Sequence, residues 1–292
     1  MTFRNTARRE EVLTGGLFLF PGVGIIFVCV FVPILLALAL SFTHCSRFLT
    51  IHWAGLYNYK KLFADPLALR SLYNTVLYVA VFVPMNLVLS LGIALLLNRN
   101  FVGMKLIRSV YFVPVVLSMV VTVSIWRFLY DYKHGPLNAV LDAIGFGSVA
   151  WLDQKAYALW AITAMALWQS SAFFAIIFLA ALQDVPQSLH EAAMVDGAGR
   201  LMRFFHVTIP SLRAVMTAVV ALSSIGAFRV FIPMFVLTQG GPAFSTRTMA
   251  LHAYLTGFDE GNLGQSSAVS FALLAIIVAA TLIVNRTRRS AQ

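Results

Sequence analysis

The chain has 292 residues, of which 60% are hydrophobic and 11% charged, and its formal net charge is +10. Soluble domains are typically about 45–50% apolar and about 25% charged. The composition therefore excludes an ordinary soluble domain and indicates an integral membrane protein. The basic balance does not indicate a nucleic-acid site. Most positive charges flank apolar segments, where anionic membrane lipid attracts them, and no basic helix with stacking aromatic residues stands apart from those segments.

Six apolar segments are long enough to cross roughly 30 Å of hydrocarbon as helices, which takes about 20 residues. They cover residues 15–42, 72–97, 109–130, 157–182, 213–238 and 264–285. The first is overlong and contains Pro21 and Pro33, which predicts a tilt or a kink. A cleavable signal peptide is the alternative for this end, because arginines precede the run and Ala37-Leu38-Ala39 resembles a cleavage site. The apolar stretch exceeds the roughly 7–15 residues of a signal core, so we expect a retained helix.

The distribution of Lys and Arg predicts the orientation of these segments, because positively charged connections stay in the cytoplasm. With a cytoplasmic N-terminus, the inner segments hold 12 of the 21 basic residues and the outer ones hold seven. Both termini and the 183–212 segment are therefore expected in the cytoplasm. The inner residues are Arg4, Arg8, Arg9, Arg99, Lys105, Arg108, Arg200, Arg203, Arg213, Arg286, Arg288 and Arg289. The outer ones are Arg47, Lys60, Lys61, Arg70, Lys133, Lys155 and Arg247, and Arg127 and Arg229 lie within spans.

The whole chain, residues 1–292, is predicted to form one transmembrane domain, an all-α six-helix bundle without a soluble domain or long linker. The outer segment 131–156 is expected to contain one short helix near Leu137–Ile144. Cys29 and Cys45 form no metal-ligand spacing and no obvious pair, so they leave the redox compartment open.

A polar segment, "HEAAMVDGAGRLMRFFHVTIP" at residues 190–210, interrupts the apolar sequence. A helical His-Glu-x-x-His would be a zinc site, with two imidazoles one turn apart. Here the fifth residue is Met194, and a thioether is a poor zinc ligand. The segment therefore lacks a ligand, and we expect no metal site.

The same segment has the pattern of two short amphipathic helices. Pro186 favours a helix start, and Asp196-Gly197-Ala198-Gly199 predicts a sharp reversal, since glycine readily adopts left-handed conformations. A second helix is expected to have Leu201, Phe204 and Phe205 on one side and to end at Pro210, before the fifth span. This element is either an interfacial loop packed under its own bundle or a docking site for a partner, and the pattern alone favours neither.

The spacing Glu191-Ala192-Ala193, three residues, Gly197, nine residues, then Val207-Thr208-Ile209-Pro210 resembles a signature of the membrane subunits of ABC importers. That signature is EAA, three residues, G, nine residues, I, any residue, LP, with Val207 and Ile209 as conservative replacements. The likeness covers most of the chain. Four further segments are similar to the carbohydrate-uptake branch, the maltose and glycerol-phosphate type permeases: "GLYNYKKLF" (55–63), "GPLNAVL" (135–141), "EAAMVDGAG" (191–199) and "LTQGGP" (237–242).

This resemblance implies a permease of a bacterial-type inner membrane that does no bond chemistry itself. Its implied partners are a second permease subunit, a cytoplasmic ATPase dimer that binds ATP and magnesium, and an extracytoplasmic solute-binding protein. The chain has no Gly-x4-Gly-Lys-Ser/Thr phosphate loop, so we expect no cofactor in it and energy from another chain. The 183–212 loop would be the coupling element, with the residues Glu191, Ala192, Ala193, Asp196, Gly197 and Pro210.

Polar groups within the spans are candidates for a solute path, because such groups are costly in a bilayer. They are Asn86, Gln169 and Arg229, together with Trp168, which could stack on a sugar. Each also has a structural alternative: hydrogen bonding between helices, packing, snorkelling or pairing with the partner subunit. The related permeases often have an Asp where "FRVFIPMF" has Ile232, so Arg229 lacks the acid that the branch provides.

Two other classes of protein fit the sequence less well. An intramembrane enzyme would need paired catalytic groups within the spans, and neither Gly-x-Ser-x-Gly nor an acid inside a span occurs. A gradient-driven secondary transporter usually has repeated halves and midplane carboxylates, whereas all eleven acids lie in tails or loops. A sugar is the expected solute, although Arg229 would also suit a phosphate.

Overall fold

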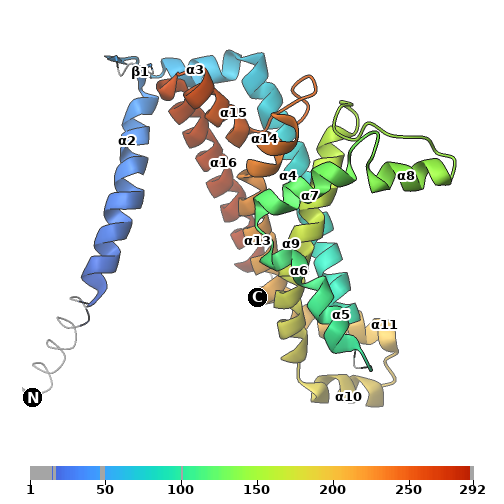
Figure 1. Cartoon of the computed structure of the whole chain (residues 1–292). Coiled ribbons are helices and arrows are strands. Elements are labelled where there is room, and N and C mark those ends of the chain that lie inside the picture. Colours follow the sequence, from blue (N-terminus) through green and yellow to red (C-terminus); the bar gives the residue numbers. More distant parts are fainter. Residues whose placement is uncertain (1–14, 16–17, 47–49, 100, 290–292) are drawn as a thin grey trace, which may run out of the picture. The chain divides into compact units, whose positions relative to one another are not determined.

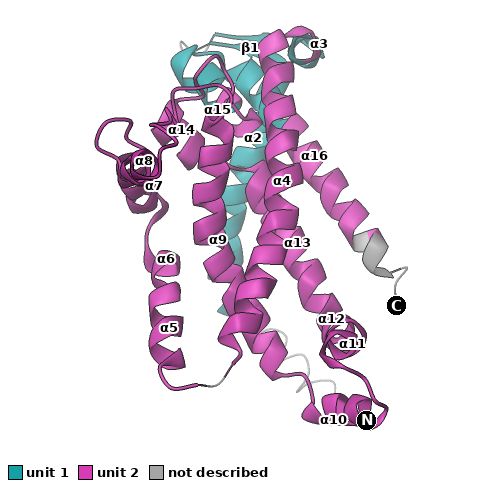
Figure 2. Cartoon of the chain, turned by 90° about the vertical axis from the view of Figure 1, so that its right-hand side faces the viewer, with its two compact units in different colours: residues 1–62, 253–271 teal, residues 63–252, 272–292 magenta. Residues whose placement is uncertain are grey.

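The computed structural model describes residues 15, 18–46, 50–99 and 101–289. These residues belong to two compact units, unit 1 with residues 1–62 and 253–271, and unit 2 with residues 63–252 and 272–292 (Figure 2). Arg4, Arg8, Arg9 and Arg47 lie outside the described residues, as do the side chains of Arg288 and Arg289. The orientation prediction is therefore not tested at these positions.

Among the described residues, four helices are long and apolar enough to cross a membrane, and two bent pairs raise the number to six if each pair is one span. The four are Phe18–Ser41, Pro66–Leu97, Ala158–Gln183 and Leu263–Val284. The first contains a π-helical turn, η1 (Phe27–Phe31), followed by α2 (Val32–Ser41). The others are α4 (Pro66–Leu97), α9 (Ala158–Gln183) and α16 (Leu263–Arg289). Apolar run length thus predicted these four helices, with α4 beginning six residues earlier than expected.

The segment predicted as a third span, 109–130, is not one helix. It is divided among α5 (Met104–Tyr111), α6 (Val113–Val116) and α7 (Met119–Leu129), with a bend of 103° after Val116. Leu117 is extended, with ψ 134°, and Ser118 caps α7 by accepting a hydrogen bond from the Val121 N–H at 3.4 Å. The hydroxyl begins a new helix inside an apolar run, because a cap satisfies a donor that the helix start leaves free.

The predicted fifth span, 213–238, is also interrupted. Helix α13 (Arg213–Phe228) ends at Arg229, and α14 (Ile232–Thr238) begins with a proline in its first turn. A 65° bend at Leu212 separates α13 from the preceding helical stretch, which comprises α11 (Arg200–Arg203), η2 (Phe204–Thr208) and α12 (Ile209–Ser211). The stretch was predicted to end at Pro210, and it ends one residue later, at Ser211. Pro210 continues the helical stretch directly from η2.

Unit 1 contains a two-stranded antiparallel hairpin that the all-α prediction did not include. Strand β1 (Thr43–Cys45) pairs with β2 (Ile51–Trp53), with Thr43 opposite Trp53. Helix α3 (Tyr57–Ala64) begins soon afterwards, and the buried Asn58 Nδ2 donates to the carbonyl oxygens of Ser41 at 2.9 Å and Thr43 at 2.8 Å. A side chain on Gly264 of α16 would overlap the Thr43 carbonyl. The "GLYNYKKLF" segment thus organises this hairpin. The rest of the unit includes η3 (Leu255–Asp259).

In unit 2, α5, α10 (Gln187–Val195) and α11 lie toward one end of α9, and α7 and α8 (Pro136–Ala143) toward the other (Figure 1). We call these the α10 end and the α8 end. At the α8 end, the buried Asn138 of "GPLNAVL" accepts from the Val149 N–H and from the Trp151 indole N–H, both at 3.0 Å. Its amide nitrogen also donates to the Val149 carbonyl oxygen at 3.0 Å. The short helix predicted near Leu137–Ile144 is confirmed.

The connection from α14 to α15 (Met249–Tyr254) is tied to α4 by two buried side chains. Asn74 Nδ2 donates to the carbonyl oxygens of Phe244 at 2.8 Å and Arg247 at 3.0 Å. The Thr75 hydroxyl accepts from the Met249 N–H at 2.8 Å. These bonds satisfy backbone groups in a segment where Gln239, Ala243 and Phe244 have positive φ. Such residues are uncommon in the left-handed region, so the surrounding hydrogen bonds are needed to hold them there.

Beside this connection lies a buried histidine. His252 Nδ1 accepts from Arg247 Nε at 3.1 Å, and His252 Nε2 lies 3.9 Å from Asp65 Oδ2. Burial lowers the pKa of His252 to about 4, Arg247 lowers it further by charge repulsion, and Asp65 acts in the opposite direction. His252 is therefore neutral at physiological pH, with its proton on Nε2 facing Asp65.

This pKa predicts a pH dependence of stability. Between about pH 6.5 and pH 4 the unfolded chain binds a proton at His252 and the folded chain does not, so the free energy of unfolding should fall as the pH falls. The full loss is about 3 kcal/mol. Thermal melting of the detergent-solubilised protein at pH 7.5 and pH 4 measures it. His252→Gln should flatten this slope, and the exposed control His52→Gln should leave it unchanged. An unchanged slope in His252→Gln would contradict the assignment.

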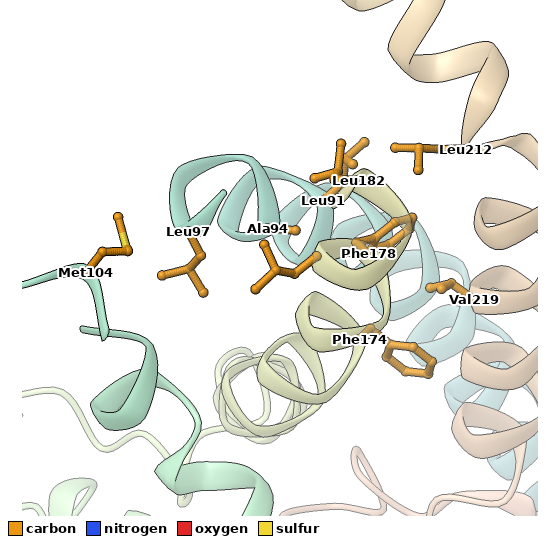
Figure 3. Packing of buried hydrophobic residues seen from close by; sticks show 10 residues of the cluster. Leu91, Ala94, Leu97, Met104, Phe174, Phe178, Leu182, Leu212 and Val219 are labelled. Atoms are coloured by element: carbon orange, nitrogen blue, oxygen red, sulfur yellow. The ribbon is translucent and has the colours of Figure 1, made fainter. Parts of the chain in front are cut away.

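Buried apolar residues form a packed cluster toward the α10 end of unit 2 (Figure 3). It is formed where α4 and α9 pack together against α13, and all of its members are buried. The residues are Leu91, Ala94, Leu97, Met104, Phe174, Phe178, Leu179, Leu182, Leu212 and Val219. The Arg108 guanidinium donates to the Leu97 carbonyl oxygen at 3.0 Å and 2.7 Å, which secures the end of α4.

Candidate functional site: the 183–212 loop and a cavity lined by Arg229

The 183–212 loop contains the two helical pieces that the sequence predicts. Helix α10 (Gln187–Val195) follows Pro186, which takes the N-cap position. Glu191 and Ala192 are exposed on it, and Ala193 is half-buried. The small side chains leave the backbone of α10 accessible to a neighbouring surface.

The reversal at Gly197 is a Schellman motif, a hydrogen-bonded turn that closes a helix C-terminus. The Ala198 N–H donates to the Ala193 carbonyl oxygen at 2.8 Å, and the Gly197 N–H donates to the Met194 carbonyl oxygen at 3.0 Å. Gly197 has φ +78°, as the sequence predicted, and Asp196 is the C-cap residue. These bonds fix the direction in which the chain leaves α10.

Apolar side chains on both helical pieces are exposed. Val195 is 89% and Leu201 76% exposed, and Leu189, Met194, Met202 and Phe205 are exposed as well. The expected apolar face of the second piece is therefore not packed against unit 2 at Leu201 and Phe205, although Phe204 is half-buried. Exposed apolar groups in a contiguous loop are typical of a protein interaction site. The geometry favours the docking alternative over a loop packed under its own bundle.

A cavity of about 600 Å³ lies in unit 2, between α4, α9, α13 and the two interrupted segments. Both breaks contribute to it, through Val115 and Met119 at one and residues 229–233 at the other. Interrupted helices are where membrane transporters expose backbone and polar groups to a solute. Aromatic residues form much of the wall, namely Tyr78, Phe82, Phe173, Phe174 and Phe231.

Gln169 lines the cavity and holds the break between α6 and α7. Its Nε2 donates to the carbonyl oxygens of Leu117 at 3.1 Å and Pro114 at 3.4 Å. These carbonyls belong to the interrupted turn, so α9 satisfies groups that a continuous helix would have paired internally. Gln169 Oε1 is buried and has no hydrogen-bond partner in the described part of the chain.

Arg229 also lines the cavity, at the C-terminal end of α13. Its side chain is exposed in the single chain, and the structure gives it no hydrogen bond or ion pair to any described residue. A cation at a helix C-terminus is favoured by the helix dipole. The position therefore holds a charged guanidinium, available to a ligand or a neighbouring subunit.

The other two residues selected from the sequence do not line the cavity. Trp168 is exposed and contacts Trp126 edge-on, with ring centroids 5.8 Å apart. Asn86 is fully buried one turn beyond Phe82 on the same face of α4, and neither amide atom has a partner among the described residues. The aromatic wall residues were not selected from the sequence, because phenylalanines are common throughout the chain.

The described residues contain no group of three or more His, Cys, Asp or Glu side chains that could hold a metal ion. His190 and Glu191 accordingly have no companion ligands there. The chemical features of the site are hydrogen bonding, aromatic contact and one positive charge.

Comparison with known proteins gives consistent results. Residues 23–290 match the family described as "Binding-protein-dependent transport system inner membrane component". The probable ABC transporter permease protein YurN of Bacillus subtilis is 33% identical over 271 residues, covering 91% of this chain and 92% of that protein. The trehalose/maltose transport system permease protein MalF of Thermococcus litoralis is 30% identical, covering 96% of each chain. The sulfoquinovosyl glycerol transport system permease protein SmoG of Agrobacterium fabrum is 33% identical, covering 83% and 79%.

Among solved structures, a chain of a bacterial ABC transporter involved in import of the acidic polysaccharide alginate has a TM-score of 0.85. It is 18% identical in sequence, with 99% of both chains covered, so the likeness establishes the fold. The family match covers most of the sequence, and the three relatives align over 79% to 96% of their own length. The chain therefore belongs to the inner membrane components of binding-protein-dependent transport systems and is the permease subunit of an ABC importer.

Proposed function

We propose that this permease imports a sugar or a related small polar solute, delivered by an extracytoplasmic binding protein and driven by a separate ATPase. The helix–turn–helix at residues 187–211 carries this proposal, because it presents exposed apolar residues on a turn fixed by Gly197. A surface of this kind is suited to dock on another subunit and to transmit its movement.

The mechanism requires a stiff connection between the ATPase and the spans. When the ATPase dimer binds ATP and closes, the seated loop moves, and the spans change from inward-open to outward-open largely as rigid bodies. A flexible loop would absorb the displacement. The Schellman bonds at Gly197 and the helical continuation through Pro210 into Ser211 support a direct transfer to α13. Glu191 and Asp196 would supply polar contacts, while Ala192 and Ala193 allow close approach.

The charges support a cytoplasmic location for the loop. Lys105, Arg108, Arg200, Arg203 and Arg213 all belong to helices at the α10 end. By the positive-inside rule this end would face the cytoplasm, and the same rule predicts from the sequence that both chain termini are cytoplasmic. ATP and magnesium would bind the partner ATPase, and the path for the solute would be shared with a second permease subunit.

A sugar fits the composition of the cavity. Aromatic rings can contact the apolar faces of a sugar, and Gln169, Ser170 and Ser223 can hydrogen-bond to its hydroxyls. The names of two relatives refer to trehalose/maltose and to sulfoquinovosyl glycerol transport. Those relatives share about a third of their sequence with this chain, which supports a solute of the same general kind.

Purification of the chain from its native membrane in mild detergent tests the proposal. An ATPase and a second permease should co-purify. The complex in liposomes, supplied with its binding protein, should take up labelled sugar only when ATP is present at the ATPase side. If the chain purified alone and its uptake followed a proton or sodium gradient without ATP, a secondary transporter would replace this proposal.

A further inference from the structure

We propose that the cavity binds an anionic sugar, one whose carboxylate, phosphate or sulfonate group is held by Arg229. This inference rests on the proposed sugar import and narrows the class of solute. It depends on the charge in the cavity, on the absence of a partner for Arg229 among the described residues, and on the other residues that line the cavity.

Arg229 is the single charged residue among those that line the cavity. No acid lines it, and the remaining polar contributions come from Gln169 and serine and tyrosine hydroxyls. A guanidinium stays protonated at all physiological pH values and presents two parallel donors that match a carboxylate or phosphate. The cavity therefore has a net positive charge that a neutral sugar would leave unpaired.

The Arg229 side chain has no hydrogen bond or ion pair to any described residue, and its backbone lies in the non-helical break between α13 and α14. A charge at membrane depth that is paired with nothing is costly, and such groups usually mark a solute or ion path. The geometry leaves the pairing to a group that enters from outside the chain.

The rest of the cavity fits the sugar part of such a solute. Its volume of about 600 Å³ is within the roughly 300–1,000 Å³ of small-molecule sites. Tyr78 and Phe82 stack with ring centroids 5.2 Å apart, forming an aromatic surface. Gln169 also lines the cavity, with its Nε2 bonded to the carbonyl oxygens of Leu117 and Pro114, and the Ser170 hydroxyl can bond to a sugar hydroxyl.

The test uses the intact importer in phosphatidylcholine liposomes, with both permease subunits, the ATPase and the binding protein. ATP-driven uptake is measured for matched probes: glucose, glucuronate and glucose 6-phosphate, and cellobiose with its uronate. Wild type is compared with Arg229→Gln, Arg229→Lys and Arg127→Gln. Arg127 is an exposed arginine outside this cavity and controls for the loss of one positive charge. Because the binding protein is the same in all samples, its own selectivity cancels in the ratios.

Arg229→Gln should lower the ratio of anionic to neutral uptake at least tenfold, equivalent to about 1.4 kcal/mol. Arg229→Lys should remain within about threefold of wild type, and Arg127→Gln should not change the ratio. The uronate and phosphate probes separate carboxylate from phosphate as the bound group.

Other results would overturn the inference. Equal loss of neutral and anionic uptake, together with loss of the co-purifying second permease, would assign Arg229 to the subunit contact. A ratio that depended on added phosphatidylglycerol would assign it to a lipid phosphate. If wild type carried neutral sugars as well as their anionic counterparts, the anionic class would be wrong while sugar import stood. If no sugar were carried with ATP present, the proposed function itself would fail.

Discussion

Replacing Gly197 with valine is expected to reduce ATP-driven uptake more than tenfold while leaving the chain inserted in the membrane. Gly197 has φ +78°, and a β-branched residue is a strong outlier in that region. The cost of about 1–2 kcal/mol would be relieved by breaking the two Schellman bonds, which would turn α10 away from its present direction. No heavy atom lies within 4 Å of a Cβ built on Gly197, so the effect acts through the backbone. Uptake by the reconstituted importer and recovery of the ATPase in a pull-down measure it.

The same loop supplies a matched control. Gly199 has extended backbone, with φ −66° and ψ 172°, and a Cβ there also meets nothing within 4 Å. Gly199→Val should therefore transport normally. Gly197→Asn should keep most of the activity, because asparagine tolerates the left-handed conformation at helix ends. Normal uptake by Gly197→Val would show that the turn does not couple this permease to the ATPase.

The positions of long helices could be predicted from the sequence because the bilayer sets a simple length requirement. Residues 157–182 were predicted to within one residue of α9 at each end. Breaks inside apolar runs were missed, since hydropathy averages over the very residues that cause them. The Ser118 hydroxyl begins α7 within an otherwise apolar run, and Ile232-Pro233 restarts the helix after Arg229. A cap or a proline is a single residue. It can break a helix within a long apolar run only when a neighbouring helix forms hydrogen bonds to the backbone groups that the break leaves unpaired.

In the 183–212 loop, the reversal of the chain could be predicted from one residue, whereas the bend before the fifth span could not. Gly197 was predicted to reverse the chain, and its positive φ confirms this. Pro210 was predicted to end the second helical piece, and that piece ends one residue later, at Ser211. The 65° bend follows at Leu212, and the sequence contains no strong signal for a bend at that residue.

The cavity was partly predictable for a related reason. Polarity in apolar runs selected Gln169 and Arg229, which line it, and also Asn86, which does not. Trp168 was selected because its ring could stack on a sugar, and it does not line the cavity either. Polarity identifies a costly residue without indicating which direction it faces. The "GLYNYKKLF" and "GPLNAVL" segments similarly indicated the family but did not indicate what their residues do in the fold. Their buried asparagines, Asn58 and Asn138, organise turns through backbone hydrogen bonds.

Replacing Gln169 with glutamate is expected to lower both stability and transport, because it removes the donor that holds the broken span. The carbonyl oxygens of Leu117 and Pro114 would lose their partner and face a carboxylate of the same size. A buried group left unpaired costs about 1–3 kcal/mol, more when the new neighbour is charged. The melting temperature of the detergent-solubilised chain should fall by several degrees, and uptake should fall more than tenfold.

Comparison with Gln169→Met separates the effect of losing the two hydrogen bonds from the effect of adding a negative charge. Methionine has a similar volume and leaves the two carbonyls unpaired without adding a negative group, so it should destabilise less than glutamate. Gln154→Glu, in the exposed outer segment, controls for adding a carboxylate elsewhere. If Gln169 acts by holding the break between α6 and α7, Gln169→Met should reduce uptake of neutral and anionic sugars equally, since the cavity wall itself is displaced. A variant that melted normally but lost uptake of one sugar class would instead assign Gln169 to solute contact through its unpaired Oε1, beside the charge that Arg229 provides.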